Sequence, residues 1–92
     1  MIVSFRHKGL KCLYATGSAR GVRAEHVPRL RRLLAALDVA TRPRDLDCAG
    51  NRLHLLKGDL AGYWSISVSG NWRIIYRFTG EDVELLDYLD YH

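Results

Sequence analysis

The first half of the chain has hydrophobic residues at helical spacing, and the second half has them in short alternating runs. The clearest helical pattern consists of four apolar residues at intervals of three and four: Val27, Leu30, Leu34 and Leu37. This amphipathic helix should begin between Ala24 and Val27, because Pro28 is favoured in a first helical turn, and should end near Ala40.

Two shorter elements are predicted before this helix. Apolar residues at helical spacing indicate a first helix over residues 8–16, and Gly17 is a suitable C-terminal stop because glycine adopts the left-handed conformation there without strain. Residues 2–5 alternate well enough to predict a short first strand.

After a loop from Thr41 to Asn51, strand-like runs cover residues 52–56, 62–69, 72–78 and 82 to about 88. Helices followed by a series of strands predict an α+β fold with a largely antiparallel sheet. The length of 92 residues fits one domain, residues 1–92, with two N-terminal helices packed on one face of the small sheet.

The register of the central hairpin can be predicted from burial. With a three-residue loop, Ser69-Gly70-Asn71, Val68 would lie opposite Trp72 and the aromatic and aliphatic residues of both strands would share one face. A shift by one residue would bury the arginines, so burial favours this register. The helices should then cover the aromatic face. The other face, with Arg73, Arg77 and several serines, should remain open and could hold RNA.

Charge is distributed unevenly along the sequence. The net charge is +4, but residues 1–80 contain all 14 Lys and Arg, and residues 81–92 contain five of the ten acids and no Lys or Arg. Such a field attracts polyanions or an acidic protein partner. The arginines beside the leucine stripe, Arg29, Arg31 and Arg32, are predicted to lie on a solvated face or to contact RNA phosphate.

Several classes of protein are excluded by composition. No apolar run approaches the ~20 residues that span a bilayer, and residues 1–8 lack the apolar stretch of a signal peptide, so we expect a cytoplasmic protein. Cys12 and Cys48 fit no zinc spacing, and the four histidines form no ligand pattern. We therefore expect neither a metal nor a cofactor.

The remaining polar residues suit metal-free cleavage of RNA. This reaction needs a base for the 2′-hydroxyl, cations for the charge on the phosphorane, and an acid for the leaving oxygen. His54 and His92 could transfer protons, since imidazole titrates near neutral pH. Lys57, Arg73 and Arg77 could stabilise the phosphorane, Tyr91 could stack on a base, and Asp90 could orient an imidazole. Alternatively, His54 is a surface residue, the last residues are an ordinary tail, and the strand arginines pair with Glu84 or Asp87.

The same residues resemble a known family. Residues 50–54, 56–59, 62–66, 70–74 and 87–92, together with residues 2–17 and 34–38, are similar to the HigB toxins of the RelE/ParE superfamily. The resemblance implies a RelE-like microbial RNase fold and a bacterial type II toxin that cleaves mRNA in the ribosomal A site. It places the functional positions on His54, Lys57, Arg73, Asp90, Tyr91 and His92. Many relatives have Glu at the position of His54, which leaves the identity of the base open.

The resemblance also implies partners and leaves rival functions. Family members are neutralised by a helix-turn-helix antitoxin, and the complex binds operator DNA to repress its own operon. The expected partners are therefore this antitoxin, the 70S ribosome with its rRNA, and mRNA, but no membrane. The rivals are a ParE-like inhibitor of DNA gyrase and a non-catalytic nucleic-acid-binding module.

Overall fold

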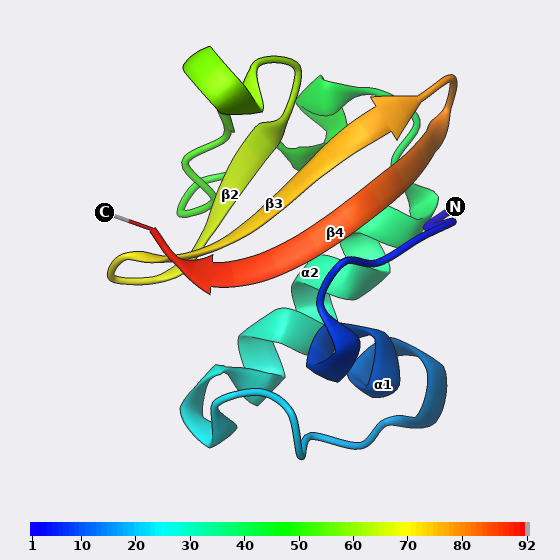
Figure 1. The fold of residues 1–92 in the computed structure, drawn as a ribbon, viewed down its shortest axis with the longest axis vertical. Coiled ribbons are helices and arrows are strands. Elements are labelled where there is room, and N and C mark those ends of the chain that lie inside the picture. The colour runs from blue at the N-terminus through cyan, green and yellow to red at the C-terminus, as the bar shows by residue number, and fades with distance from the viewer. Residues whose placement is uncertain (92) are drawn as a thin grey trace.

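The fold is a four-stranded antiparallel sheet with two helices against one face, as Figure 1 shows. The computed structural model describes residues 1–91. The helices are α1 (Lys8–Thr16) and α2 (Val27–Val39), and the strands are β1 (His54–Leu55), β2 (Trp64–Ser69), β3 (Trp72–Thr79) and β4 (Asp82–Asp90). Three short 3₁₀ turns, η1 (Ala24–His26), η2 (Pro43–Leu46) and η3 (Gly58–Leu60), connect them. The sheet order is β1-β2-β3-β4, so the predicted α+β architecture is confirmed.

Both helices begin and end as the sequence predicted. The His7 Nδ1 atom accepts a hydrogen bond from the Leu10 backbone N–H at 3.0 Å, which caps the start of α1. Gly17 ends α1 in the left-handed conformation with φ 78°, and its N–H donates to the Leu13 carbonyl. Pro28 lies in the first turn of α2, which ends at Val39. No helix in the described part of the chain is long and apolar enough to cross a membrane.

One hydrophobic core lies between the helices and the sheet. The α2 residues Leu30, Leu33, Leu34 and Leu37 are buried there against Ile66, Val68, Ile74 and Tyr76 of the sheet. Trp64, Trp72 and Phe78 pack at its margin. The predicted aromatic face is therefore the covered face. Removing this apolar surface from water supplies the main stabilisation of the domain.

The hairpin keeps the predicted faces but closes differently. Trp64 pairs with Tyr76 and Ile66 with Ile74, as expected, but Ser69, not Val68, lies opposite Trp72. The loop is thus the two-residue Gly70-Asn71, in which Gly70 has φ 55°. A register shift between Ser67 and Ser69 accommodates the extra residue, which preserves the alternation over the rest of β2.

The N-terminal segment and the last strand also differ from prediction. Residues 2–5 form only two isolated parallel bridges to β4, Ile2 to Val83 and Phe5 to Leu86. β4 reaches Asp90, two residues beyond the predicted end, while the first predicted sheet strand shortens to His54–Leu55. A shift in β4, where Leu85 has φ 57°, places Arg77 opposite Glu84. The C-terminal residues up to Asp90 therefore belong to the sheet, not to a loose tail.

Candidate active site

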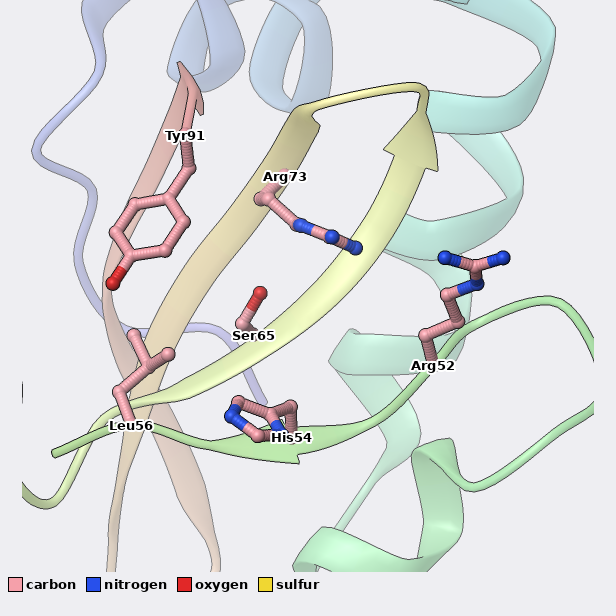
Figure 2. Close-up of a pocket in the computed structure, with 6 residues that line it drawn as sticks. All are labelled: Arg52, His54, Leu56, Ser65, Arg73 and Tyr91. Atoms are coloured by element: carbon pink, nitrogen blue, oxygen red, sulfur yellow. The ribbon is translucent and has the colours of Figure 1, made fainter.

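A cavity of about 300 Å³ opens on the face of the sheet that the helices leave uncovered. Figure 2 shows its six lining residues, which lie on β1, β2 and β3, on the segments that flank β1 and just after β4, with the helices behind. They are Arg52, His54, Leu56, Ser65, Arg73 and Tyr91, and we call this the front cavity. The residues come from four parts of the chain, which only the folded sheet brings together.

The strand register explains why these side chains meet. His54 pairs with Ser65, which pairs with Ile75, so these three residues form one row across the sheet. Arg73 lies two residues before Ile75 on β3 and therefore points to the same face. Ser65, Leu56 and Ile75 are 3%, 6% and 3% exposed, so they form a buried floor on this face. The sequence had predicted that this face is open.

The side chains of Arg52, His54 and Arg73 at the front cavity have no protein partner among the described residues. Arg52 and His54 are exposed and Arg73 is half-buried. None of their side chains forms a hydrogen bond or an ion pair with another residue in the described part of the chain. Two guanidinium groups without a protein anion beside them are suited to bind an anion that enters from solvent.

Tyr91 completes the wall at the end of the chain. Its backbone N–H donates to the Asn71 carbonyl at 2.8 Å, so the strand direction continues one residue past β4. Its ring is 37% exposed and lies beside the cavity in Figure 2. An aromatic ring in this position can stack on a nucleobase. His92, predicted as a catalytic residue, lies outside the described residues.

Arg52 and Ser65 were not predicted as site residues. Arg52 adopts a left-handed φ of 50°, which is uncommon for a residue other than glycine and fits a constrained position. The loop that holds it is anchored by Asn51, whose Nδ2 atom donates to the Leu46 carbonyl at 2.9 Å. The signal in the sequence was the spacing: Arg52, His54 and Leu56 alternate, as residues on one face of an extended segment do.

Arg29 is not the solvated residue that the helical pattern predicted. Its guanidinium donates to the Gly50 and Ser67 carbonyls and to Asn51 Oδ1, at 3.1, 3.0 and 3.0 Å. The side chain therefore ties α2 to β2 and to the loop before β1. This role in the fold leaves its charge less available to RNA, whereas Arg32 on the same helix is exposed.

Three other predicted site residues lie away from the front cavity. Arg77 pairs with Glu84 at 2.6 Å, the alternative that strand pairing had left open, and this interaction raises the pKa of Arg77. Asp90 lines a different cavity on the opposite face, because it is adjacent to Tyr91 and alternation directs it the other way. Lys57 is exposed just before η3 and does not line the front cavity.

Comparison with known proteins identifies the family. Residues 3–92 match the model of the RelE-like toxin of type II toxin–antitoxin system HigB. The chain belongs to this family of toxins. It is 49% identical over 92 residues, all of both chains, to the Endoribonuclease HigB of Proteus vulgaris. It is also 33% identical over 94 residues, 100% of this chain and 98% of its relative, to Toxin HigB-1 of Vibrio cholerae serotype O1.

A solved structure has the same fold. The YoeB–YefM complex from Staphylococcus aureus contains a chain that superimposes with a TM-score of 0.64, covering 100% of this toxin and 95% of that chain. The sequence identity is 18%, so this likeness concerns the fold alone.

Proposed function

We propose that this toxin cleaves mRNA on the ribosome, using the front cavity to hold the scissile phosphate. Endoribonuclease activity agrees with membership of the HigB family and with 49% identity to an Endoribonuclease HigB over the whole chain. The observation that supports the site is the grouping of Arg52, His54 and Arg73 around one cavity without protein partners in the described part of the chain.

The reaction requires no atom beyond the RNA and the side chains. His54 takes the proton of a 2′-hydroxyl, and the resulting oxygen attacks the adjacent phosphorus. The bond from phosphorus to the 5′-oxygen breaks, which leaves a 2′,3′-cyclic phosphate and a protonated 5′-oxygen. Arg73 and Arg52 stabilise the negative charge that builds up on the phosphorane oxygens. Tyr91 holds a neighbouring base by stacking.

The proton for the leaving oxygen comes, in this proposal, from His92. It follows Tyr91 directly in the sequence, and a protonated imidazole can give its proton to a leaving oxygen. Lys57 supplies positive charge from outside the cavity, and Asp90 acts from the opposite face by positioning the end of the chain.

The ribosome supplies what the isolated domain lacks. The front cavity is small, at about 300 Å³, and can enclose little more than the reacting nucleotide. A ribosome that holds the mRNA in place would lower the entropy cost that the toxin must meet to position the phosphate. Arg32, exposed on α2, would contact rRNA phosphate. The reaction would then take place in the cytoplasm.

A toxin of a type II system acts together with an antitoxin, and the family description names such a system. We expect the antitoxin of this toxin to contain a helix-turn-helix domain and to recruit the toxin to operator DNA. Neutralisation requires only that the antitoxin keep mRNA from the front cavity or keep the toxin off the ribosome.

Primer extension on a reporter mRNA in a cell-free translation system tests the proposal. We expect cuts that occur only while ribosomes translate the message, and none in the same mRNA without ribosomes. Efficient cleavage of the free mRNA at physiological salt would contradict ribosome dependence. Inhibition of gyrase supercoiling without cuts would instead indicate a ParE-like activity. The absence of both cuts and gyrase inhibition would indicate a non-catalytic binding module.

A further inference from the structure

A second, larger cavity of about 540 Å³ lies on the helix side of the same end of the sheet. Its wall contains three aromatic or imidazole rings and two arginines, and Asp90 lies at its margin. The residues that matter are His7, Arg20, Arg23, Trp72, Tyr88 and Asp90, and we call this the rear cavity. Apart from Asp90, no residue of this cavity has a role in the function proposed above.

The two cavities lie back to back. Trp72 and Arg73 are consecutive on β3, and Asp90 and Tyr91 are consecutive at the end of β4, where Trp72 pairs with Asp90. Because successive strand residues point to opposite faces, one member of each couple lines the rear cavity and the other lines the front cavity. The cavities are thus separated by the thickness of one sheet.

Both cavities border the end of β4, where Asp90 and Tyr91 are consecutive. The N-terminal segment covers that edge only as far as Leu86, whose carbonyl accepts from the Arg6 and His7 N–H groups. In the described part of the chain, residues 87–90 of β4 have no strand on that side. This end of β4 is therefore where a single extended strand of nucleic acid would cross from one face of the sheet to the other.

The rear cavity is rigidly built. The His26 Nδ1 atom lies 2.5 Å from the buried Tyr88 hydroxyl, which also accepts from the Arg23 N–H at 3.4 Å. The Trp72 ring packs at 4.8 Å from the Tyr88 ring. Gly21 touches α1 so closely that a Cβ added there would lie 2.5 Å from the Gly9 Cα atom. These contacts fix the loop that carries both arginines.

Its chemistry fits one nucleotide. The Arg23 guanidinium lies 5.6 Å from the Trp72 ring centre. Both the planar guanidinium group and the aromatic ring are groups that stack on nucleobases. Glu25 neutralises much of the Arg23 charge at 2.6 Å. Arg20, which is exposed and forms no ion pair with any described residue, is left as the cation for a phosphate.

We propose that the rear cavity binds the mRNA nucleotide adjacent to the one cleaved in the front cavity, with Arg20 on its phosphate. This inference rests on the proposed function and adds a second contact for the same strand. It would make cleavage depend on the nucleotide that flanks the cut.

The first test measures binding without cleavage. A short single-stranded RNA with 2′-O-methyl groups cannot be cut. A base of this RNA that stacks at Trp72 should quench the fluorescence of that tryptophan. Arg20→Ala should weaken this binding by about tenfold and reduce the dependence of log affinity on log salt by about 0.7. Arg44→Ala, which removes the same charge from the exposed turn η2, is the matched control and should bind like the wild type.

The second test measures cleavage on translating ribosomes. Arg20→Ala should raise KM about tenfold with kcat little changed, and Arg20→Lys should recover part of the loss. If RNA quenches Trp72 in an Arg20-dependent way but no cleavage occurs, RNA binding at the rear cavity stands, whereas the proposed function fails and with it the position of this nucleotide beside a cut. Equal RNA affinity for Arg20→Ala and Arg44→Ala overturns it. The inference is also overturned if Arg20→Ala loses binding only to ribosomes without mRNA or only to the antitoxin. Either result would assign the cavity to rRNA or to a protein partner.

Discussion

Arg73→Ala should abolish cleavage while leaving the fold intact. The side chain is half-buried at the front cavity and has no partner in the described part of the chain. Its removal therefore breaks no internal hydrogen bond, and we expect a change in unfolding free energy of about 0.5 kcal/mol. Loss of one group that stabilises the transition-state charge typically costs about 10²–10³ in rate.

Its neighbour Trp72 provides the opposite expectation. Trp72 packs on Tyr88 and His26 at the margin of the core, with ring centres at 4.8 and 5.5 Å. Trp72→Ala should therefore cost about 3 kcal/mol, toward the lower end of the range for such truncations because the ring is half-buried. For a domain of this size, that corresponds to a fall in Tm of more than about 10 °C.

Thermal melts and primer extension on translating ribosomes measure both effects. Arg77→Ala is the matched control, since Arg77 lies on the same face of β3 but pairs with Glu84 outside the front cavity. It should retain cleavage within a few-fold of the wild type. The assignment is wrong if Arg73→Ala melts below Trp72→Ala, or if Arg73→Ala cleaves as fast as Arg77→Ala.

Three further predictions concern the fold. Arg29→Ala should lower the unfolding free energy by about 2–3 kcal/mol in denaturant melts, because three acceptors lose their donor. Arg32→Ala is the control and should leave the unfolding free energy unchanged. Equal effects of the two substitutions would contradict the anchoring role of Arg29. Tyr76→Phe should raise Tm, because the buried Tyr76 hydroxyl has no hydrogen-bond partner in the described part of the chain; a lower Tm would show that the hydroxyl is satisfied. The Ile2 N–H and the Tyr14 hydroxyl lower the pKa of Asp38, so its stabilisation is present above its unfolded pKa and is lost as the pH falls through the lower folded value. Stability curves of Asp38→Asn should accordingly fall less steeply below about pH 4 than those of the wild type.

Burial made the sheet predictable, and local geometry limited the prediction. Shifting β2 against β3 by one residue would have buried Arg73, so the pairing of Ile66 with Ile74 followed from the sequence alone. The irregularities near Val68 and Leu85 did not follow, since a bulge changes the count of residues without changing which ones are apolar. The end of β4 was missed because its acidic residues resembled an exposed tail.

The site was predictable in part for a related reason. His54, Arg73 and Tyr91 were identified from their chemistry and lie together at the front cavity. Arg52 was overlooked because a residue before a strand gives no periodic signal of its own, and its left-handed φ depends on the loop that Arg29 holds. The sequence grouped Asp90 with Tyr91 and His92 as site residues, whereas strand alternation places Asp90 at the rear cavity and Tyr91 at the front cavity.

The position of the acids along β4 explains why a modest net charge can still direct RNA to one end of the sheet. At the start of β4, Asp82 lies 3.3 Å from the N-terminal ammonium and Glu84 pairs with Arg77, so basic groups there are neutralised. Near the other end, the Asp87 Oδ1 atom accepts from the Tyr88 N–H, and neither Arg52 nor Arg73 pairs with a described acid. The field that attracts an anion is therefore set by which cations lack partners, not by the 14 basic residues as a group. Because the unpaired cations of both cavities lie at the end of the sheet where β3 begins and β4 ends, the proposed binding of RNA and its proposed cleavage would coincide there.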